Sequence, residues 1–143
     1  MATRDLCHNV HPVRAISPAA AKTDNTPFVS EIIDTKGYES LTFLLAAGDI
    51  ADADATLTVL VEASDAANMA GAEAVPDKEL IGTEAQAGLS FADDNKTRKI
   101  GYVGGKRYVR LTVTPANNTG NIFLAAIALL GHPRNAPTPN PPV

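Results

Sequence analysis

The feature that most constrains the fold is a succession of short strand patterns separated by turn signals, extending from residue 28 to residue 132. Its clearest member is 107–114, in which Val109, Leu111 and Val113 share one face and polar side chains share the other. Such alternation places one face of a strand against a core and the other toward solvent. Because turn signals recur roughly every ten residues, the pattern predicts an all-β fold, an antiparallel β-sandwich of jelly-roll-like type.

Further strands are expected at 28–33, 40–46, 56–62, 79–83, 97–103 and 121–130. The last is an uninterrupted apolar run, for which a short helix is the competing interpretation because alanine is common in it. Its length and the preceding Gly120 favour a strand, and we expect it to be central in its sheet. Gly104 and Gly105 predict a hairpin between the strands that flank them.

The connections and the core follow from the same pattern. An acidic loop is expected at 48–54, a single helical turn between Ser64 and Gly71, and a loop at 85–95. The predicted core residues are Ile32, Leu41, Phe43, Leu57, Val59, Val61, Val109, Leu111, Val113, Ile122 and Leu124.

Proline marks both ends of the chain, which hold eight of the ten prolines. Because proline blocks helices and central strands, residues 1–27 are expected to form an extended arm, with one short strand at 10–16. Residues 133–143 are expected to form a Pro-rich extended tail. The sandwich domain is therefore assigned to residues 28–132.

Composition narrows the function classes. The chain has 143 residues, 45% of them hydrophobic, but aromatic residues make up only 5% and tryptophan is absent, which indicates a thin aliphatic core and favours an oligomer, a dimer or a trimer. A formal charge of −4 disfavours nucleic acid and anionic membranes as partners. No signal peptide or apolar run of membrane-spanning length is visible. The lone Cys7 excludes an internal disulfide, which is compatible with assembly in a reducing cytoplasm.

Two clusters have donor types that suit metals. Cys7, His8 and His11 resemble zinc ligands, but they crowd at a Pro-flanked end without a second cluster. Asp49, Asp52 and Asp54 share a loop as calcium ligands do, but the glycine and distal glutamate of an EF-hand are missing. We therefore expect no metal and no cofactor, and interpret the clusters as an ordinary arm and a solvated loop.

Catalytic signatures are not found in the sequence. There is no strained G-x-S-x-G turn for a serine hydrolase, and Gly101–Gly105 lacks the Lys-Ser/Thr of a phosphate loop. Scarce aromatics also disfavour glycosidase clefts and sugar-stacking platforms. A basic cluster, Lys96, Arg98, Lys99, Lys106, Arg107 and Arg110, suits docking on an acidic protein surface, although a plain solvated hairpin is the more favoured interpretation.

The stretch from Gly104 to Arg134, GGKRYVRLTVTPANNTGNIFLAAIALLGHPR, resembles small proteins encoded beside the major capsid gene of tailed bacteriophages. Residues 37–42 and 57–63 are similar to the same group, so the likeness covers roughly residues 28 to 134. It rests on strand sequences such as K-R-Y-V-R and on a G-x-P-R-like ending, and it brings no active-site motif.

This resemblance implies a virion structural protein, and most of all a head decoration (cement) protein on the capsid exterior whose partner is the major capsid protein. A head–tail or tail component is a further reading, and a non-catalytic module binding carbohydrate or a host surface is the alternative from another class. The residues expected to make capsid or oligomer contacts are Arg4, His8, His11, Val13 and Arg14 in the arm and Arg134 near the tail.

Overall fold

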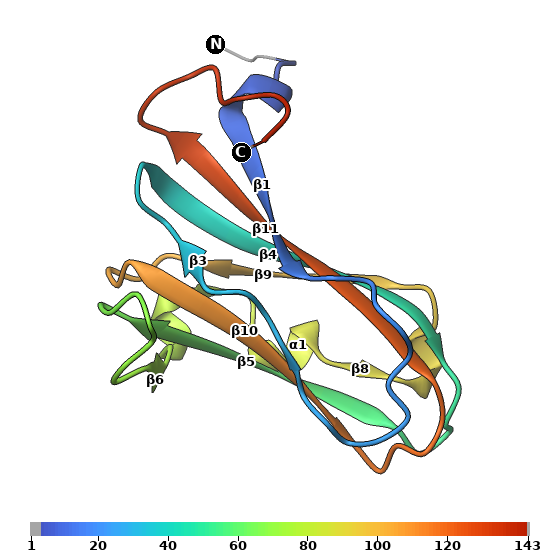
Figure 1. Ribbon diagram of the computed structural model, residues 1–143. Coiled ribbons are helices and arrows are strands. Elements are labelled where there is room, and N and C mark those ends of the chain that lie inside the picture. The colour runs from blue at the N-terminus through green and yellow to red at the C-terminus, as the bar shows by residue number, and fades with distance from the viewer. Residues whose placement is uncertain (1–3, 143) are drawn as a thin grey trace.

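The computed structural model describes residues 4–142 and shows two antiparallel sheets packed face to face (Figure 1). Sheet I contains, in spatial order, β1 (Val10–Ile16), β11 (Ile122–Pro133), β4 (Tyr38–Ile50), β9 (Thr97–Tyr102) and β7 (Leu80–Ile81). Sheet II contains β2 (Phe28–Val29), β10 (Tyr108–Ala116), β5 (Thr56–Ser64) and β6 (Glu73–Ala74), with β3 (Ile33–Asp34) also on β10 and β8 (Leu89–Ser90) also on β5. The predicted all-β sandwich is confirmed.

The helical elements are short. They are α1 (Glu84–Ala87) and three 3₁₀ turns at Cys7–Asn9, Asp77–Glu79 and Phe91–Asp93. The helix α1 begins in the segment expected to be a loop, because Thr83 and Gln86 form a capping box in which each side chain accepts a hydrogen bond from the other's backbone N–H. Within residues 4–142, no helix is long and apolar enough to cross a bilayer.

The core lies between the two sheets and is aliphatic, as the composition predicted. Val61, Val109, Leu111 and Val113 are fully inaccessible, and Phe43 is the large aromatic among them. Every predicted core residue is buried except Ile32, which is 40% exposed. The isoleucine that enters the core is its neighbour Ile33, 1% exposed.

An interruption at Ser30 explains the error at Ile32. The expected strand at 28–33 is divided into β2 and β3, and Ser30 between them places its hydroxyl where a ladder carbonyl would be. This oxygen accepts a hydrogen bond from the Leu111 N–H (2.9 Å) and donates one to the Glu31 carbonyl (2.7 Å). The alternation restarts after this kink, so that Ile33 rather than Ile32 faces inward.

The glycine pair 104–105 does not make a hairpin. The strands that flank it, β9 and β10, lie in different sheets, so the chain crosses from one layer to the other here. The Tyr102 hydroxyl holds this crossing by donating to the Lys106 carbonyl (2.9 Å) and accepting from the Lys106 N–H (3.0 Å).

The segment after β5 contains turns instead of the expected helical turn. Ser64 does accept a hydrogen bond from the Ala66 N–H, but its hydroxyl also donates to the Ala70 carbonyl. Met69 and Gly71 take positive φ angles of 62° and 66°, which no right-handed helix allows. The acidic loop is also shorter than expected, because β4 continues through Gly48 and Asp49 to Ile50.

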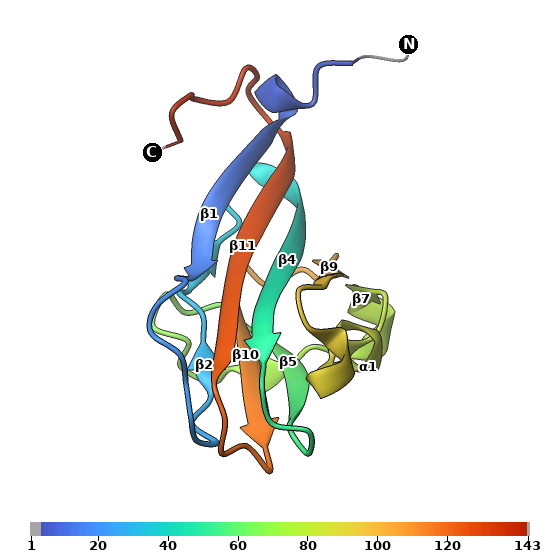
Figure 2. The same cartoon turned by 90° about the vertical axis from the view of Figure 1, so that its right-hand side faces the viewer.

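The run from Asn121 to Leu130 is a strand, as predicted, and not a helix. It lies inside its sheet, paired with β1 on one side and β4 on the other, although it is not the middle strand (Figure 2). The strand expected at 10–16 is also present as β1, and it contributes Ala15 and Ile16 to the core. This part of the expected arm is thus a strand of the sandwich.

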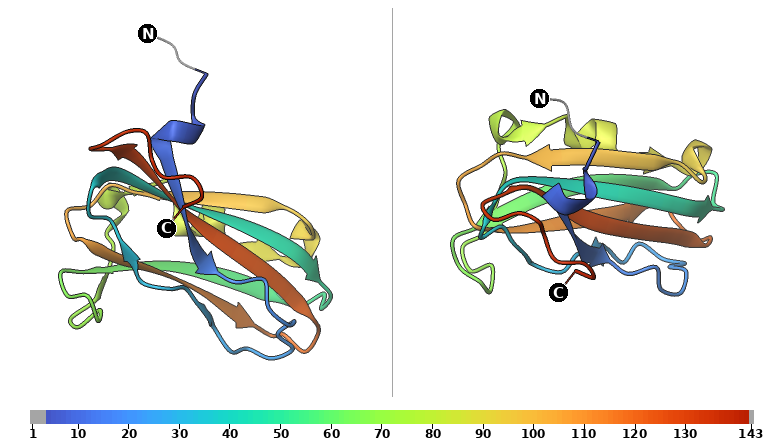
Figure 3. Two further views of the ribbon diagram at one scale, coloured as in Figure 1. Left: turned by 45° about the horizontal axis from the view of Figure 1, so that its top comes forward. Right: turned by 90° about the horizontal axis from the view of Figure 1, so that it is seen from above.

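The tail folds back on the arm. The Thr138 N–H donates to the His8 carbonyl (2.9 Å), and its hydroxyl donates to the Val10 carbonyl (2.6 Å). The described ends of the chain therefore lie together at one end of the sandwich, beyond the last residues of β11 (Figures 1 and 3). We call this end, residues 4–10 and 132–142, the terminal lobe; Met1–Thr3 and Val143 lie outside the described residues.

Both edges of sheet I are obstructed against the addition of another strand. On β1, Pro12 has no N–H to offer, Thr138 occupies the Val10 carbonyl, and the Glu31 N–H donates to the Ala15 carbonyl. At the other edge, β7 pairs with Gly101 and Tyr102 of β9, and α1 lies beside the rest of β9. Addition of a strand is therefore obstructed at both edges of sheet I.

Candidate functional site

The outward face of sheet I is apolar and uncovered. Four of its large side chains are well exposed: Leu44 (38%), Ile127 (46%), Phe123 (42%) and Ile81 (63%). The outward side chains in the middle of this sheet are together called the apolar face. They are Phe123, Ala125, Ile127 and Leu129 of β11, Thr42, Leu44 and Ala46 of β4, Thr97 and Lys99 of β9, and Ile81 of β7. No other segment between residues 4 and 142 covers its centre (Figure 2).

The register of the strands arranges these side chains in rows across the sheet. One row consists of Arg14, Ile127, Leu44 and Lys99, each opposite the next on the neighbouring strand. On one side lies a row of smaller side chains, Ala125, Ala46 and Thr97. In the row on the other side, Thr42 and Gly101 lie between the larger Leu129 and Ile81. Rows two residues apart along a strand are separated by roughly 7 Å, so the central row forms a ridge, with one shallow trough over the small row and another over Gly101.

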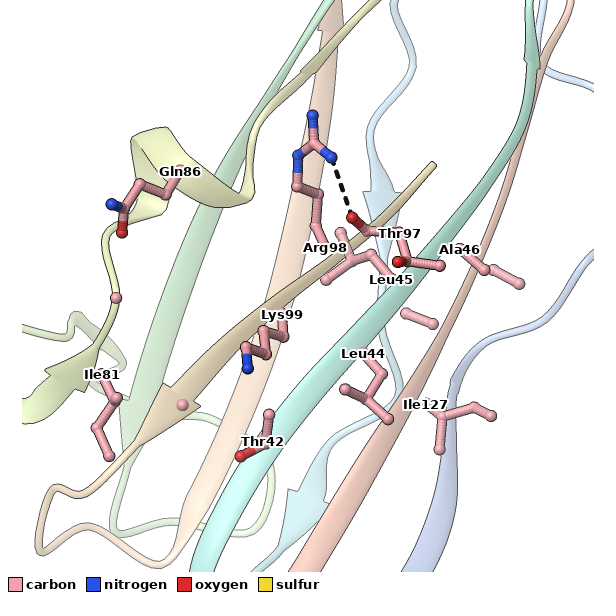
Figure 4. Close-up of a pocket in the computed structure, with 14 residues that line it drawn as sticks. Thr42, Leu44, Leu45, Ala46, Ile81, Gln86, Thr97, Arg98, Lys99 and Ile127 are labelled. Carbon is pink, nitrogen blue, oxygen red and sulfur yellow. Dashed lines mark hydrogen bonds between the residues drawn. The ribbon is translucent and has the colours of Figure 1, made fainter. Parts of the chain in front are cut away.

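A groove of about 1030 Å³ occupies this face. Its lining includes Leu44, Ile127 and Ile81, with Gly101 in the floor, and Gln86 of α1 lies across the groove from Ile127 (Figure 4). Gly101 has no side chain, and a Cβ there would come within 3.1 Å of the Ile81 Cβ. The lining contains no aromatic ring and no carboxylate. It thus offers aliphatic surface and two cations, Arg98 and Lys99.

The outward face of sheet II has a different character. Its two long strands present Thr56, Thr58, Leu60 and Glu62 on β5 and Tyr108, Arg110, Thr112 and Thr114 on β10. Leu60 is the one large aliphatic side chain on these two strands that is exposed, at 37%. Arg110 and Glu62 form an ion pair of 3.1 Å across this face. A threonine-rich and charge-paired surface of this kind is stable in water, so the two faces are unequal.

Arg98 is fixed at the end of the groove by a carboxylate outside it. Its guanidinium lies 2.7 Å from Asp93 Oδ1 and also donates to the Thr97 and Gly88 carbonyls. The backbone N–H of Ser90 donates to Asp93, and with Lys96 and Arg98 nearby this lowers the pKa of Asp93 to about 2. The charge of Arg98 is therefore compensated within the chain.

The predicted contact residues are distributed over the terminal lobe and β1. Arg4 and His8 are exposed, and His8 Nδ1 lies 2.6 Å from Asp5 Oδ2. Arg134 is exposed, and its side-chain Nε lies 3.3 Å from Glu39 Oε1. The backbone N–H of Arg134 donates to the Gly37 carbonyl. Arg14 is exposed on β1 beside Glu31. These residues lie on accessible surface, and their role in assembly stays a prediction.

Two of the predicted contact residues point into the protein. His11 is 9% exposed, stacks on Tyr38 with ring centroids 5.6 Å apart, and has no hydrogen-bond partner for Nδ1 among the described residues. Val13 is half-buried against the core. Both pack in the part of sheet I next to the terminal lobe, and their role in contacts with a partner stays a prediction.

Neither candidate metal cluster assembles in the described residues. His8 and His11 are separated by their different environments, one paired with Asp5 and the other buried. In the acidic loop, Asp52 accepts hydrogen bonds from the Asp54 N–H and the Thr119 N–H, which lower its pKa and connect this loop to the turn before β11.

The apolar face was missed by reasoning from sequence. Its signal was visible in the uninterrupted apolar run at 121–130, which was interpreted as a central strand. The structure shows that Leu124, Ala126 and Ala128 face the core while Phe123 and Ile127 are exposed. An apolar run with one exposed face therefore marks a candidate interaction surface.

Comparison of the sequence with protein-family profiles gives no match. Comparison with curated proteins gives none either. Among solved structures, the SPBc2 prophage-derived protein YomS is similar with a TM-score of 0.44 and 14% identity, over 85% of this chain and 93% of that one. A chain of infectious bursal disease virus, Gx strain, has a TM-score of 0.43 and 10% identity, over 90% of this chain and 34% of that one.

A xylan-binding domain from CBM 22 is similar with a TM-score of 0.40 and 10% identity, over 90% of each chain. At such TM-scores and identities these likenesses assign no function to this chain.

Proposed function

We propose that this chain is a structural protein of a bacteriophage virion, and specifically a decoration (cement) protein that binds the outside of the capsid lattice and stabilises it. The observation that carries the proposal is the apolar face, an uncovered aliphatic surface on one side of the sandwich. The two long strands of the other side are mostly polar, with Leu60 and the neighbouring Val29 of β2 as its exposed aliphatic residues. The likeness of residues 104–134 to proteins encoded beside phage capsid genes names the assembly to which such a surface would bind.

The proposed mechanism is mechanical. The apolar face packs on the capsid surface and removes water from Leu44, Ile127 and Ile81, and each copy adds this contact to the same lattice. Burial of apolar surface stabilises such a contact by roughly 25 cal/mol per Å² before the costs of association. Copies that also contact one another would bind with the added strength of multivalency. The terminal lobe, at one end of the same sheet, lies where it can reach a neighbouring subunit.

A sugar-binding function fits the groove less well. Sugar rings stack on aromatic side chains, whereas the groove is lined by aliphatic residues and the nearest ring on this face is Phe123. The experiment therefore has to exclude two alternatives, a glycan ligand and a position of the protein at the head–tail joint or in the tail.

The test is co-sedimentation with capsids of a tailed phage assembled without this protein, together with light scattering of the free chain. Leu44→Asp places a charge on the apolar face, and Leu60→Asp is its matched control, because Leu60 is the same residue type with nearly the same exposure (37% against 38%) on sheet II. We expect Leu44→Asp to weaken binding at least tenfold and Leu60→Asp to leave it within twofold.

Equal binding by the two variants would contradict docking through the apolar face. A wild-type chain that ignores capsids but sediments with tails or binds a glycan array would replace the decoration role by one of the alternatives. Thermal unfolding of each variant confirms that the fold is intact, which we expect because both positions are partly exposed.

A further inference from the structure

Lys99 differs from the other basic residues of its sequence cluster. The other five form ion pairs within the chain: Lys96 and Arg98 with Asp93, Lys106 with Glu73, Arg107 with Asp34, and Arg110 with Glu62. Lys99 makes no ion pair or side-chain hydrogen bond with any residue between 4 and 142. Lys99 is therefore the one residue of the cluster whose charge is not paired within residues 4–142.

The position of Lys99 is also unusual, because it is exposed at the end of the ridge on the apolar face. It lies opposite Leu44 on the neighbouring strand, and Thr97 precedes it and Gly101 follows it on the same side of β9. Figure 4 shows its side chain within the groove, between Ile81 and Leu44. A partner that covers Leu44 would therefore also remove water from the Lys99 ammonium.

Desolvation decides what the partner has to supply. An ammonium that loses its water without gaining a counter-charge destabilises the contact, whereas a carboxylate that it meets at hydrogen-bond distance compensates for the loss. The groove lining contains no carboxylate, although the chain as a whole carries 16 acidic and 12 basic residues. The counter-charge must therefore come from the molecule that docks.

The same observation disfavours a second copy packed by the same face. In a two-fold dimer each copy presents an identical surface, so two lysines would be covered and neither groove would supply a carboxylate. The obstructed edges of sheet I likewise disfavour a partner that adds a strand. A side-chain contact with a different protein remains.

We propose that the apolar face binds a protein segment of the capsid lattice that carries an aspartate or glutamate beside an aliphatic side chain. The carboxylate pairs with Lys99, and the aliphatic side chain enters the trough over Gly101 between Thr42 and Ile81. This inference rests on the proposed function and names the chemistry of the partner surface: acidic and aliphatic, rather than basic, aromatic or glycan.

The first test is charge reversal. We expect Lys99→Glu to weaken binding to capsids at least tenfold, because it places two carboxylates together, and Lys99→Gln to weaken it several-fold and reduce its dependence on salt. Lys78→Glu is the matched control, since Lys78 is exposed, changes the net charge equally and does not line the groove. It should bind within twofold of the wild type.

The second test identifies the partner atom. A carbodiimide joins an ammonium to a carboxylate in direct contact, so treatment of wild-type complexes followed by mass spectrometry should give a link from Lys99 to an Asp or Glu of the capsid protein. A link from Lys99 to a second copy of this chain would overturn the assignment of the partner.

The outcomes separate this inference from the proposed function. If Lys99→Glu binds capsids as the wild type does while Leu44→Asp does not, the proposed pairing of Lys99 with a partner carboxylate is wrong. Docking through the apolar face then still stands. If the wild type does not bind capsids, the proposed function and the partner assigned here both fall.

Discussion

At the scale of single residues, one hydroxyl keeps sheet II continuous where its edge strand is interrupted. Ser30 replaces a backbone partner for the Leu111 N–H, and Leu111 is fully buried. A buried N–H left without an acceptor destabilises a fold by about 1–3 kcal/mol. We therefore expect Ser30→Ala to lower the free energy of unfolding by about 2 kcal/mol in urea titrations.

The control for this prediction is Ser17→Ala. The Ser17 hydroxyl accepts a hydrogen bond from the Arg14 guanidinium at the exposed surface, so its loss should change stability by less than about 0.5 kcal/mol. Equal effects of the two substitutions would show that the Ser30 hydroxyl is not a structural acceptor.

Asp93 makes stability dependent on acid pH. Its pKa is lowered from 3.8 to about 2 in the folded protein, first by the Ser90 N–H and then by Lys96 and Arg98. A depressed pKa means that the stabilisation is present above the unfolded value near 4 and is lost as the pH falls through about 2. We expect the difference in melting temperature between wild type and Asp93→Asn to be constant from pH 5 to pH 7 and to shrink below pH 4.

Calorimetry from pH 2 to pH 7 measures this difference. Asp54→Asn is a suitable control, because the Asp54 side chain makes no ion pair or hydrogen bond with residues 4–142 and its variant should keep a constant difference from the wild type. A pH-independent difference for Asp93→Asn would indicate that the carboxylate acts by shape alone.

At the scale of elements, β1 is the strand predicted at 10–16, but it belongs to the sandwich and not to a separate arm. It pairs with β11 from Val10 to Ile16 and buries Ala15 and Ile16, although the region around it was expected to be an arm. Deletion of residues 1–20 removes this strand and uncovers an edge of β11. We expect the deletion to lower stability by at least about 3 kcal/mol and to promote aggregation.

Deletion of residues 139–143 is the comparison for this prediction. It retains Thr138 and its bonds to His8 and Val10, so melting temperature and solubility should stay close to those of the wild type. A stable, soluble chain without residues 1–20 would show that β1 is dispensable and restore the interpretation of an independent arm.

Local sequence predicted strands better than it predicted their partners. Alternation in 56–62 and 107–114 identified β5, β10 and their inward residues, because burial on one face leaves a period of two. The prediction of a hairpin at Gly104–Gly105 was wrong, because turn residues indicate a change of chain direction but not which sheet the next strand joins. The interruption at Ser30 and the apolar face were not predicted for a related reason. A side chain that accepts a hydrogen bond from another strand, and a sheet face that nothing covers, are defined only by neighbours distant in the sequence.

At the scale of the whole molecule, the sandwich has one polar and one apolar side. The difference predicts that an environment-sensitive hydrophobic dye binds to the folded protein at the groove. We expect Ile127→Asp to reduce the fluorescence of the bound dye strongly and Leu60→Asp to leave it unchanged, because only Ile127 lines the groove. Dye binding that is equal in both variants would locate the accessible apolar surface elsewhere.

The joined ends of the chain have a practical consequence. Because the Thr138 bonds to the arm hold residues 4 and 142 at the same end of the sandwich, a tag or enzyme fused to either side would emerge from one place. On a particle coated with this protein, cargo attached at that place would form a regular array whose spacing is set by the lattice. Because these hydrogen bonds keep both ends of the chain at one end of the sandwich, the loops at 51–55 and 117–120, at the far end, would stay accessible to a second and independent label.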